Sequence, residues 1–303
     1  MQKPEDFIFP ATPFDEKTEI KYKDSIIQIP TGRKTKDNKE ETIPCLFKKT
    51  PNSKKLLIFF HCNGGDMYYA YSVLPKILEN FNFNFLFPEY PGYTIYNIPK
   101  SSQKCLDNAL IIYDFCLKNM KNLTEKNIYI FGRSLGSGPA IYLSSHKNPA
   151  GTFLLSPYTT FAEVAKWHHE KDFYNELTKH LRSIDYVDKI KCPVCFFHGN
   201  NDHLIDCKES EILFKKCEKT DKKELHFIDN MGHNDVIHYR NEMKELAEKF
   251  IEKYCPFEQN QENISLDLDK SFYYKDSIES GECIEGSYNI NVVTISYFMY
   301  NLF

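Results

Sequence analysis

Asn127-Ile128-Tyr129-Ile130-Phe131-Gly132-Arg133-Ser134-Leu135-Gly136 is the stretch of sequence that decides the fold. Its first five residues form an apolar, β-branched and aromatic run, which predicts a buried strand. Residues 137–145 then predict the start of a helix. Between the two, Gly132, Ser134 and Gly136 form the G-x-S-x-G pattern of a nucleophile elbow. We expect this turn to be so tight that only glycine fits on either side of the serine.

Strands and helices are predicted to alternate along most of the chain. Apolar runs with strand character are followed by stretches with helical spacing of apolar residues at 55–60, 83–87, 152–155, 194–197 and 224–228. This alternation predicts an α/β fold with a mostly parallel central sheet flanked by helices. We also expect a first hairpin from 25–29 and 42–47, and a final helix over about 234–254.

Three segments depart from the alternation. Residues 1–20 predict an irregular arm, and residues 158–190 predict a small cap segment within a domain that covers 1–255. Residues 256–303 form a C-terminal extension that begins polar and ends in the apolar stretch 292–300. Its role stays open between an added strand, a partner-binding segment and a poorly ordered tail.

Composition narrows the class of protein. A length of 303 residues, 42% of them hydrophobic, predicts a globular chain with a sizeable core. The net charge of −4 argues against nucleic acid as a partner. No signal peptide and no run of about 18 apolar residues is visible. We therefore expect a cytoplasmic protein without a transmembrane segment, and peripheral contact with membranes stays open.

The ten cysteines are scattered through predicted strands and helices. This pattern predicts reduced thiols rather than a disulfide framework. Cys192 and Cys195 form a C-x-x-C within a strand-like run, which we interpret as two structural thiols, with a redox or zinc role as the alternative. We expect no metal site and no organic cofactor.

A serine hydroxyl needs a base to take its proton, and the base needs a third group to fix its tautomer. After an elbow serine the acid is expected next and the histidine last. Asp202 lies in a polar loop after the strand at 194–197, and His233 lies in a loop after the strand at 224–228. Ser134, Asp202 and His233 are therefore the predicted catalytic residues.

Each assignment has rivals. Asp206 is the alternative acid, although we expect it to cap the next helix. The alternative bases are His203, His238 in the predicted final helix, and the pair His168-His169 in the cap.

The oxyanion hole is expected to use two backbone N–H groups. One belongs to Leu135, directly after the nucleophile, and the other to Asn63, in the loop after the strand at 55–60. Four aromatic residues are candidates for a substrate-binding acyl pocket, with plain core packing as the alternative: Tyr93, Tyr158, Phe161 and Trp167.

Six motifs in residues 7–254 stand together in one order: His61-Cys62-Asn63-Gly64, Glu89-Tyr90-Pro91-Gly92-Tyr93, residues 132–139, Ser156-Pro157, residues 198–202 and Gly232-His233-Asn234-Asp235. This set resembles the α/β-hydrolase-domain serine hydrolases that include protein depalmitoylases. The resemblance implies the α/β-hydrolase fold and a triad at Ser134, Asp202 and His233. It also implies cleavage of acyl esters or thioesters, among them palmitoyl groups on a lipidated protein.

Two features depart from that family. Cys62 stands where the family usually has glycine, in the loop with the expected oxyanion donor. The first cysteine is Cys45, whereas the family's depalmitoylases have an N-terminal cysteine cluster that is lipidated. Two alternatives to a thioesterase therefore remain: a short-chain carboxylesterase or lipase, and a catalytically silent hydrolase fold that acts as a binding partner.

Overall fold

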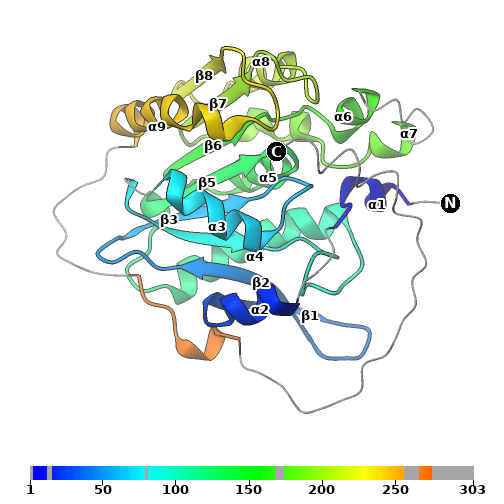
Figure 1. The fold of residues 1–303 in the computed structure, drawn as a ribbon, viewed down its shortest axis with the longest axis vertical. Coiled ribbons are helices and arrows are strands. Elements are labelled where there is room, and N and C mark those ends of the chain that lie inside the picture. The colour runs from blue at the N-terminus through cyan, green and yellow to red at the C-terminus, as the bar shows by residue number, and fades with distance from the viewer. Residues whose placement is uncertain (1–2, 12–15, 79–80, 168–173, 256–265, 275–303) are drawn as a thin grey trace.

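The computed structural model describes residues 3–11, 16–78, 81–167, 174–255 and 266–274. Its centre is an eight-stranded sheet in the order β1-β2-β4-β3-β5-β6-β7-β8, which runs from the bottom to the top of Figure 1. β2 runs antiparallel to both strands beside it, β1 and β4, and β3 to β8 are parallel to one another. The strands are β1 Ile26–Lys34, β2 Glu40–Lys48, β3 Lys55–Phe60, β4 Phe83–Pro88, β5 Ile128–Arg133, β6 Gly151–Leu155, β7 Val194–Gly199 and β8 Lys223–Ile228. This confirms the predicted α/β fold.

Helices cover both faces of the sheet, as parallel strands require. The main ones are α3 Met67–Ile77, α4 Ser102–Asn119, α5 Ser137–His146, α8 Lys208–Lys216 and α9 Arg240–Tyr254. Local signals start two of them: the side chain of Asp66 accepts from the N–H of Tyr69 at the start of α3, and Ser101 does the same for Lys104 at α4.

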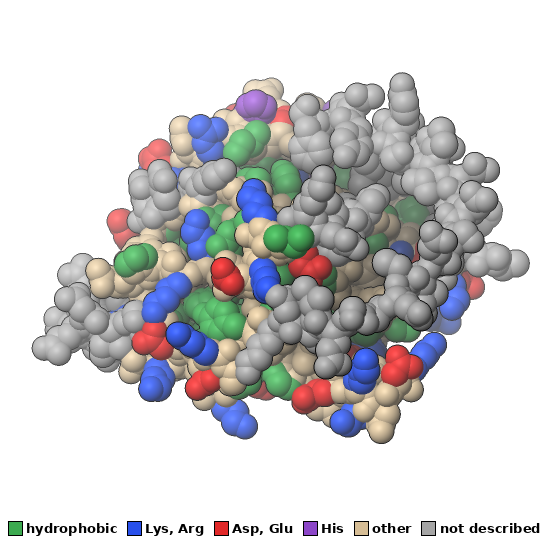
Figure 2. All heavy atoms as spheres, turned by 60° about the horizontal axis from the view of Figure 1, so that its bottom comes forward, with side chains coloured by type: hydrophobic (Ala, Val, Ile, Leu, Met, Phe, Trp, Pro, Cys, Tyr) green, Lys and Arg blue, Asp and Glu red, His purple; other side chains and the backbone are tan. Residues whose placement is uncertain are grey.

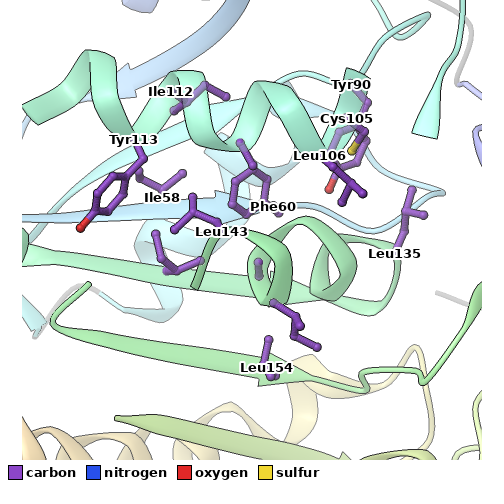
Figure 3. Close-up of a cluster of buried hydrophobic side chains, with 14 of the residues drawn as sticks. Ile58, Phe60, Tyr90, Cys105, Leu106, Ile112, Tyr113, Leu135, Leu143 and Leu154 are labelled. Atoms are coloured by element: carbon purple, nitrogen blue, oxygen red, sulfur yellow. The ribbon is translucent and has the colours of Figure 1, made fainter. Parts of the chain in front are cut away.

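The alternating side chains of the strands build two cores. Along β3, Ile58 and Phe60 join the cluster under α4 and α5, whereas Leu57 and Phe59 join the cluster under α3 and α9. Figure 3 shows the first cluster, in which side chains of the sheet meet side chains of α4 and α5. Because both faces of β3 are buried after its first residue, its sequence is apolar from Leu56 to Phe60.

The structure differs from the sequence prediction at both ends of the fold. Residues 1–20 were expected to be irregular, yet they contain α1 Pro4–Ile8 and the start of α2 Glu16–Tyr22. Ile8 and the following Phe9 are fully buried, so the packing of this arm stabilises short helices that the sequence signals only weakly. The final α-helix begins at Arg240 rather than near 234, because a 3₁₀ turn, η8 Val236–Tyr239, precedes it.

The predicted cap segment consists of short elements. They are α6 Phe161–Trp167, α7 Tyr174–Leu177 and the 3₁₀ turns Ser183–Asp185 and Val187–Lys189. In the C-terminal extension, residues 266–274 pack beside the edge strand β1, where Tyr273 bridges Ile27 and the N–H of Tyr274 donates to the carbonyl of Ile26. The apolar stretch 292–300 lies outside the described residues.

Lys and Arg side chains are interspersed with Asp and Glu side chains across the described part of the face in Figure 2. No helix in the described part of the chain has both the length and the apolar character needed to cross a bilayer.

Candidate active site

Ser134 follows β5 directly and has the strained backbone that an elbow requires. Its φ is +51°, in the left-handed region that a serine rarely adopts. A Cβ at Gly132 would overlap the backbone of Gly136, and a Cβ at Gly136 would overlap the carbonyl of Phe60. The prediction that only glycine fits at these two positions is confirmed.

The structure brings Ser134, His233 and Asp202 together although they are far apart in the chain. His233 Nε2 lies 3.1 Å from Ser134 Oγ, and His233 Nδ1 lies 2.8 Å from Asp202 Oδ2. A carboxylate only accepts hydrogen bonds, so Nδ1 carries the proton and Nε2 is left free to accept from the serine hydroxyl. This is the tautomer that a general base needs.

A close approach of two loops produces this geometry. The Asp202 loop follows β7 and the His233 loop follows β8, and the N–H of Asn201 donates to the carbonyl of Met231 at 3.1 Å. A Cβ at Gly199 would overlap that same carbonyl. Asp235 Oδ1 accepts from the N–H of Gly232 at 2.8 Å and so shapes the turn that carries the histidine. The sequence signal for this role is an aspartate three residues after a glycine.

The Asp202 carboxylate is buried and fully engaged. Burial alone would raise its pKa, but hydrogen bonds with His198 and His233 outweigh burial and hold the pKa well below its usual range. Its Oδ1 also accepts from the N–H groups of Leu204 and Ile205, each at 2.9 Å. Asp202 is therefore ionised throughout the neutral range.

His198, in β7, contacts the Asp202 loop through one of its ring nitrogens. Its Nε2 lies 2.9 Å from the carbonyl of Ile205 and 3.3 Å from Asp202 Oδ2, and its Nδ1 lies 2.6 Å from the hydroxyl of Ser210. The pattern assigns an Nε2–H tautomer that accepts from Ser210 at Nδ1.

The imidazole of His233 has its pKa lowered from the usual value. Burial is the main cause, the hydrogen bond with Asp202 opposes it, and the nearby Arg133 guanidinium adds to the lowering. Arg133 Nη2 donates to the carbonyl of His233 at 3.1 Å, so this side chain also fixes the histidine loop. In the sequence, the position of Arg133 directly before the serine is the only signal for this contact.

Two buried tyrosines hold the residues predicted to form the oxyanion hole. The hydroxyl of Tyr93 donates to the carbonyl of Asn63 at 2.8 Å, and the hydroxyl of Tyr158 donates to the carbonyl of Leu135 at 3.1 Å. Burial raises the pKa of both hydroxyls well above the usual value, so they stay protonated donors. Each tyrosine therefore holds the peptide unit that directly follows a predicted donor N–H.

The loop that follows β3 is fixed by further buried hydrogen bonds. His61 Nε2 lies 3.0 Å from Glu89 Oε1, and Tyr90 donates its hydroxyl to the carbonyl of His61 at 2.7 Å. Glu89 Oε2 accepts from the hydroxyl of Thr94 at 2.7 Å. The polar side chains of the turn after β4, residues 89–94, therefore hold the loop after β3 in place.

The rivals for the acid and the base lie elsewhere. Asp206 Oδ1 accepts from the N–H of Lys208 and so caps α8, as the sequence predicted. His203 and His238 are exposed, and His238 lies in the 3₁₀ turn before α9 rather than in the helix. The pair His168-His169 lies outside the described residues.

The four aromatic candidates for an acyl pocket are not gathered in one. Tyr93, Tyr158 and Phe161 are buried in the cluster beneath α4 and α5, where two of them hold the loops just described. Trp167 ends α6, and its side chain lies outside the described residues. Plain packing and loop support therefore account for these residues better than a shared pocket.

Cys192 and Cys195 belong to different hydrophobic clusters, one on each side of the sheet, and both are buried. Among the residues that the structure describes, no group of three His, Cys, Asp or Glu side chains is arranged to hold a metal ion.

Comparison of the sequence with known proteins identifies relatives. A protein of Acanthamoeba polyphaga mimivirus that is named as an α/β hydrolase is 32% identical over 194 residues, which cover 63% of this chain and 71% of that protein. The chain belongs to the α/β-hydrolase family. Human alpha/beta hydrolase domain-containing protein 17B is 28% identical over 215 residues, 71% of this chain and 73% of that protein. No family model matches the chain.

Solved structures agree with this α/β-hydrolase fold. The Pyrococcus furiosus esterase Pf2001 superposes with a TM-score of 0.62 at 17% identity, over 81% of this chain and 96% of that one. Est1E from Butyrivibrio proteoclasticus gives a TM-score of 0.55 at 18% identity, over 75% of this chain and 99% of that one. Membership of the family makes this protein a hydrolase, and esterases of known structure have the same fold.

Proposed function

We propose that this α/β hydrolase is a serine hydrolase that cleaves acyl esters or thioesters, with Ser134, His233 and Asp202 as its catalytic residues. The observation that carries the proposal is the continuous chain of hydrogen bonds from Ser134 Oγ through His233 to Asp202. The esterases among the solved structures of the same fold favour an acyl ester. The motif resemblance to protein depalmitoylases adds thioesters on a lipidated protein as a substrate class.

The chemistry follows from the positions of the atoms. Ser134 Oγ attacks the acyl carbonyl carbon while its proton passes to His233 Nε2, and Asp202 stabilises the imidazolium that forms. The N–H groups of Leu135 and Asn63 donate to the oxyanion. His233 then returns the proton to the departing oxygen or sulfur as its bond to the acyl carbon breaks. Water, deprotonated by the same nitrogen, releases the acid from Ser134.

A fluorophosphonate probe tests the proposal, because it reacts only with an activated serine. We expect stoichiometric labelling of the full-length protein and, after digestion, a single modified peptide that contains Ser134. Absence of labelling at this serine would favour the alternative of a silent hydrolase fold that acts as a binding partner.

The pH dependence of activity should reflect the buried histidine. His233 must be neutral to accept the serine proton, and burial lowers its pKa below the usual value of about 6.5. We therefore expect the acid limb of the pH profile of kcat/KM to have its midpoint below pH ~6.5. A limb centred above that value would contradict the role given to this residue.

Removal of either tyrosine hydroxyl behind the oxyanion hole should slow the chemical step. We expect Tyr93→Phe and Tyr158→Phe each to lower kcat by about tenfold with little change in KM, because the donors lose their fixed orientation. Tyr129→Phe is the matched control, since its buried hydroxyl donates to the carbonyl of Cys255, far from the site. Equal losses of kcat in all three variants would show a general packing effect instead.

A further inference from the structure

An apolar cavity of about 150 Å³ lies on the face of the sheet that is covered by α3 and α9. Its floor consists of large side chains from four neighbouring strands: Leu57, Phe59, Phe131, Phe153, Leu155 and Phe197. Its walls come from the two helices, with Ala70, Val73 and Leu74 on α3 and Met243 and Ala247 on α9. The two helices therefore do not close fully over the centre of the sheet.

The cavity extends along the strands. Phe83, the first residue of β4, lines one end, while His61 and Arg133, at the carboxyl ends of β3 and β5, line the other. Because its lining follows the strands from one end to the other, the cavity is an elongated slot, with a shape that suits a linear chain better than a compact ring.

One end of the slot lies beside the loops that carry the proposed catalytic residues. Three lining residues stand next in sequence to the oxyanion donor, the nucleophile and the base: Cys62, Arg133 and Asn234. Arg133 Nε is buried there and has no hydrogen-bond partner in the described part of the chain. The lining therefore begins one residue away from Ser134 and from His233 along the chain, and a buried donor without a partner among the described residues lies where it begins.

The opening of the slot between the helices is also apolar. Tyr69 on α3 and Ile237 in η8 both line it, and each has 41% of its surface exposed. Large exposed hydrophobic side chains beside a cavity are typical of a surface that meets an apolar ligand. Arg240 and Lys244 add positive charge near this opening.

We propose that this slot binds the acyl chain of the substrate, an inference that rests on the proposed function. The apolar floor and walls offer no partner to a polar leaving group, but they suit methylene groups. An apolar protein cavity of about this volume binds benzene. By that comparison, about six carbons fill the slot.

A chain-length series measured with the full-length protein tests the slot. With nitrophenyl esters from acetyl to palmitoyl, kcat/KM should rise roughly fourfold for each methylene up to about six carbons and then level off. Ala247→Phe and Ala70→Phe fill the slot from opposite walls. Each should lower kcat/KM for the octanoyl ester at least tenfold and change that for the acetyl ester less than twofold. Asn241→Phe, on the exposed side of α9, is the control and should change neither.

The outcomes separate the two proposals. Unaltered octanoyl-to-acetyl ratios in both alanine variants, with acetyl activity retained, would overturn the slot and leave the proposed function intact. Loss of all hydrolysis and of Ser134 labelling in the wild type would overturn the proposed function itself. The apolar stretch 292–300 is the alternative occupant. If Ile295→Asp raises octanoyl hydrolysis as much as the filling variants should lower it, that stretch and not the substrate occupies the slot.

Discussion

Ser134→Ala should lower kcat for an activated acyl ester by about 10⁴- to 10⁶-fold, down to the rate that binding and the oxyanion hole alone support. The reason is the loss of the proposed attacking atom: His233 Nε2 accepts from Ser134 Oγ at 3.1 Å, and alanine has no oxygen to replace it. Alanine keeps the same Cβ at the same left-handed backbone. The fold should therefore survive, and the melting temperature should change by only a few degrees.

The neighbouring strand supplies a matched control. Ser156 directly follows β6, is buried, and has a φ of +48°, close to the +51° of Ser134. Its hydroxyl has no hydrogen-bond partner among the described residues. Ser156→Ala should therefore leave kcat and fluorophosphonate labelling within about twofold of the wild type. If Ser134→Ala retained more than about one hundredth of the activity, another nucleophile would have to be sought.

Asp202→Asn should lower kcat by about 10⁴-fold, because it reverses the tautomer of the base. The asparagine oxygen can keep the two bonds that Asp202 Oδ1 accepts from the N–H groups of Leu204 and Ile205. Its NH₂ group would then face His233 Nδ1, where the carboxylate accepts now. A donor at that place favours the imidazole with its proton on Nε2, which can no longer accept from Ser134.

Asp206→Asn is the control for this change. Asp206 lies four residues further along the same loop, and its Oδ1 accepts from the N–H of Lys208, a bond that asparagine retains. This variant should keep kcat and stability near those of the wild type. A fall in kcat of less than tenfold in Asp202→Asn, with the fold intact, would show that another group orients the histidine.

Local patterns made much of the fold predictable. The continuous apolar runs at β3 and β5 indicate strands that are buried on both faces, which is typical of a parallel sheet. The crowding at Gly132 and Gly136 follows from the tight turn itself. Strands that alternate with helices then fix a mostly parallel sheet. The order of Ser134, Asp202 and His233 along the chain could be predicted because the carboxyl ends of parallel strands meet at one edge.

Contacts between distant loops were beyond the reach of sequence patterns. For Tyr93 and Tyr158 the sequence left both a pocket and plain core packing open, because an aromatic ring after a strand gives no sign of where its hydroxyl points. In the structure both hydroxyls donate to carbonyls of the loops predicted to form the oxyanion hole. The apolar slot depends on how far α3 and α9 stand apart, a distance that no periodicity encodes. The short helices of residues 1–20 likewise need the packing of Ile8 and Phe9 against the rest of the chain.

By itself, then, the sequence determined the order of the strands and helices along the chain, the tight turn and the three candidate side chains, since each follows from neighbours in the chain or from a strand end. Only the tertiary structure decided which hydroxyl, ring nitrogen and carboxylate oxygen face one another, and where the apolar slot lies. Those features depend on distances between segments about 30 to 100 residues apart, which are set when the whole core packs rather than by any local preference.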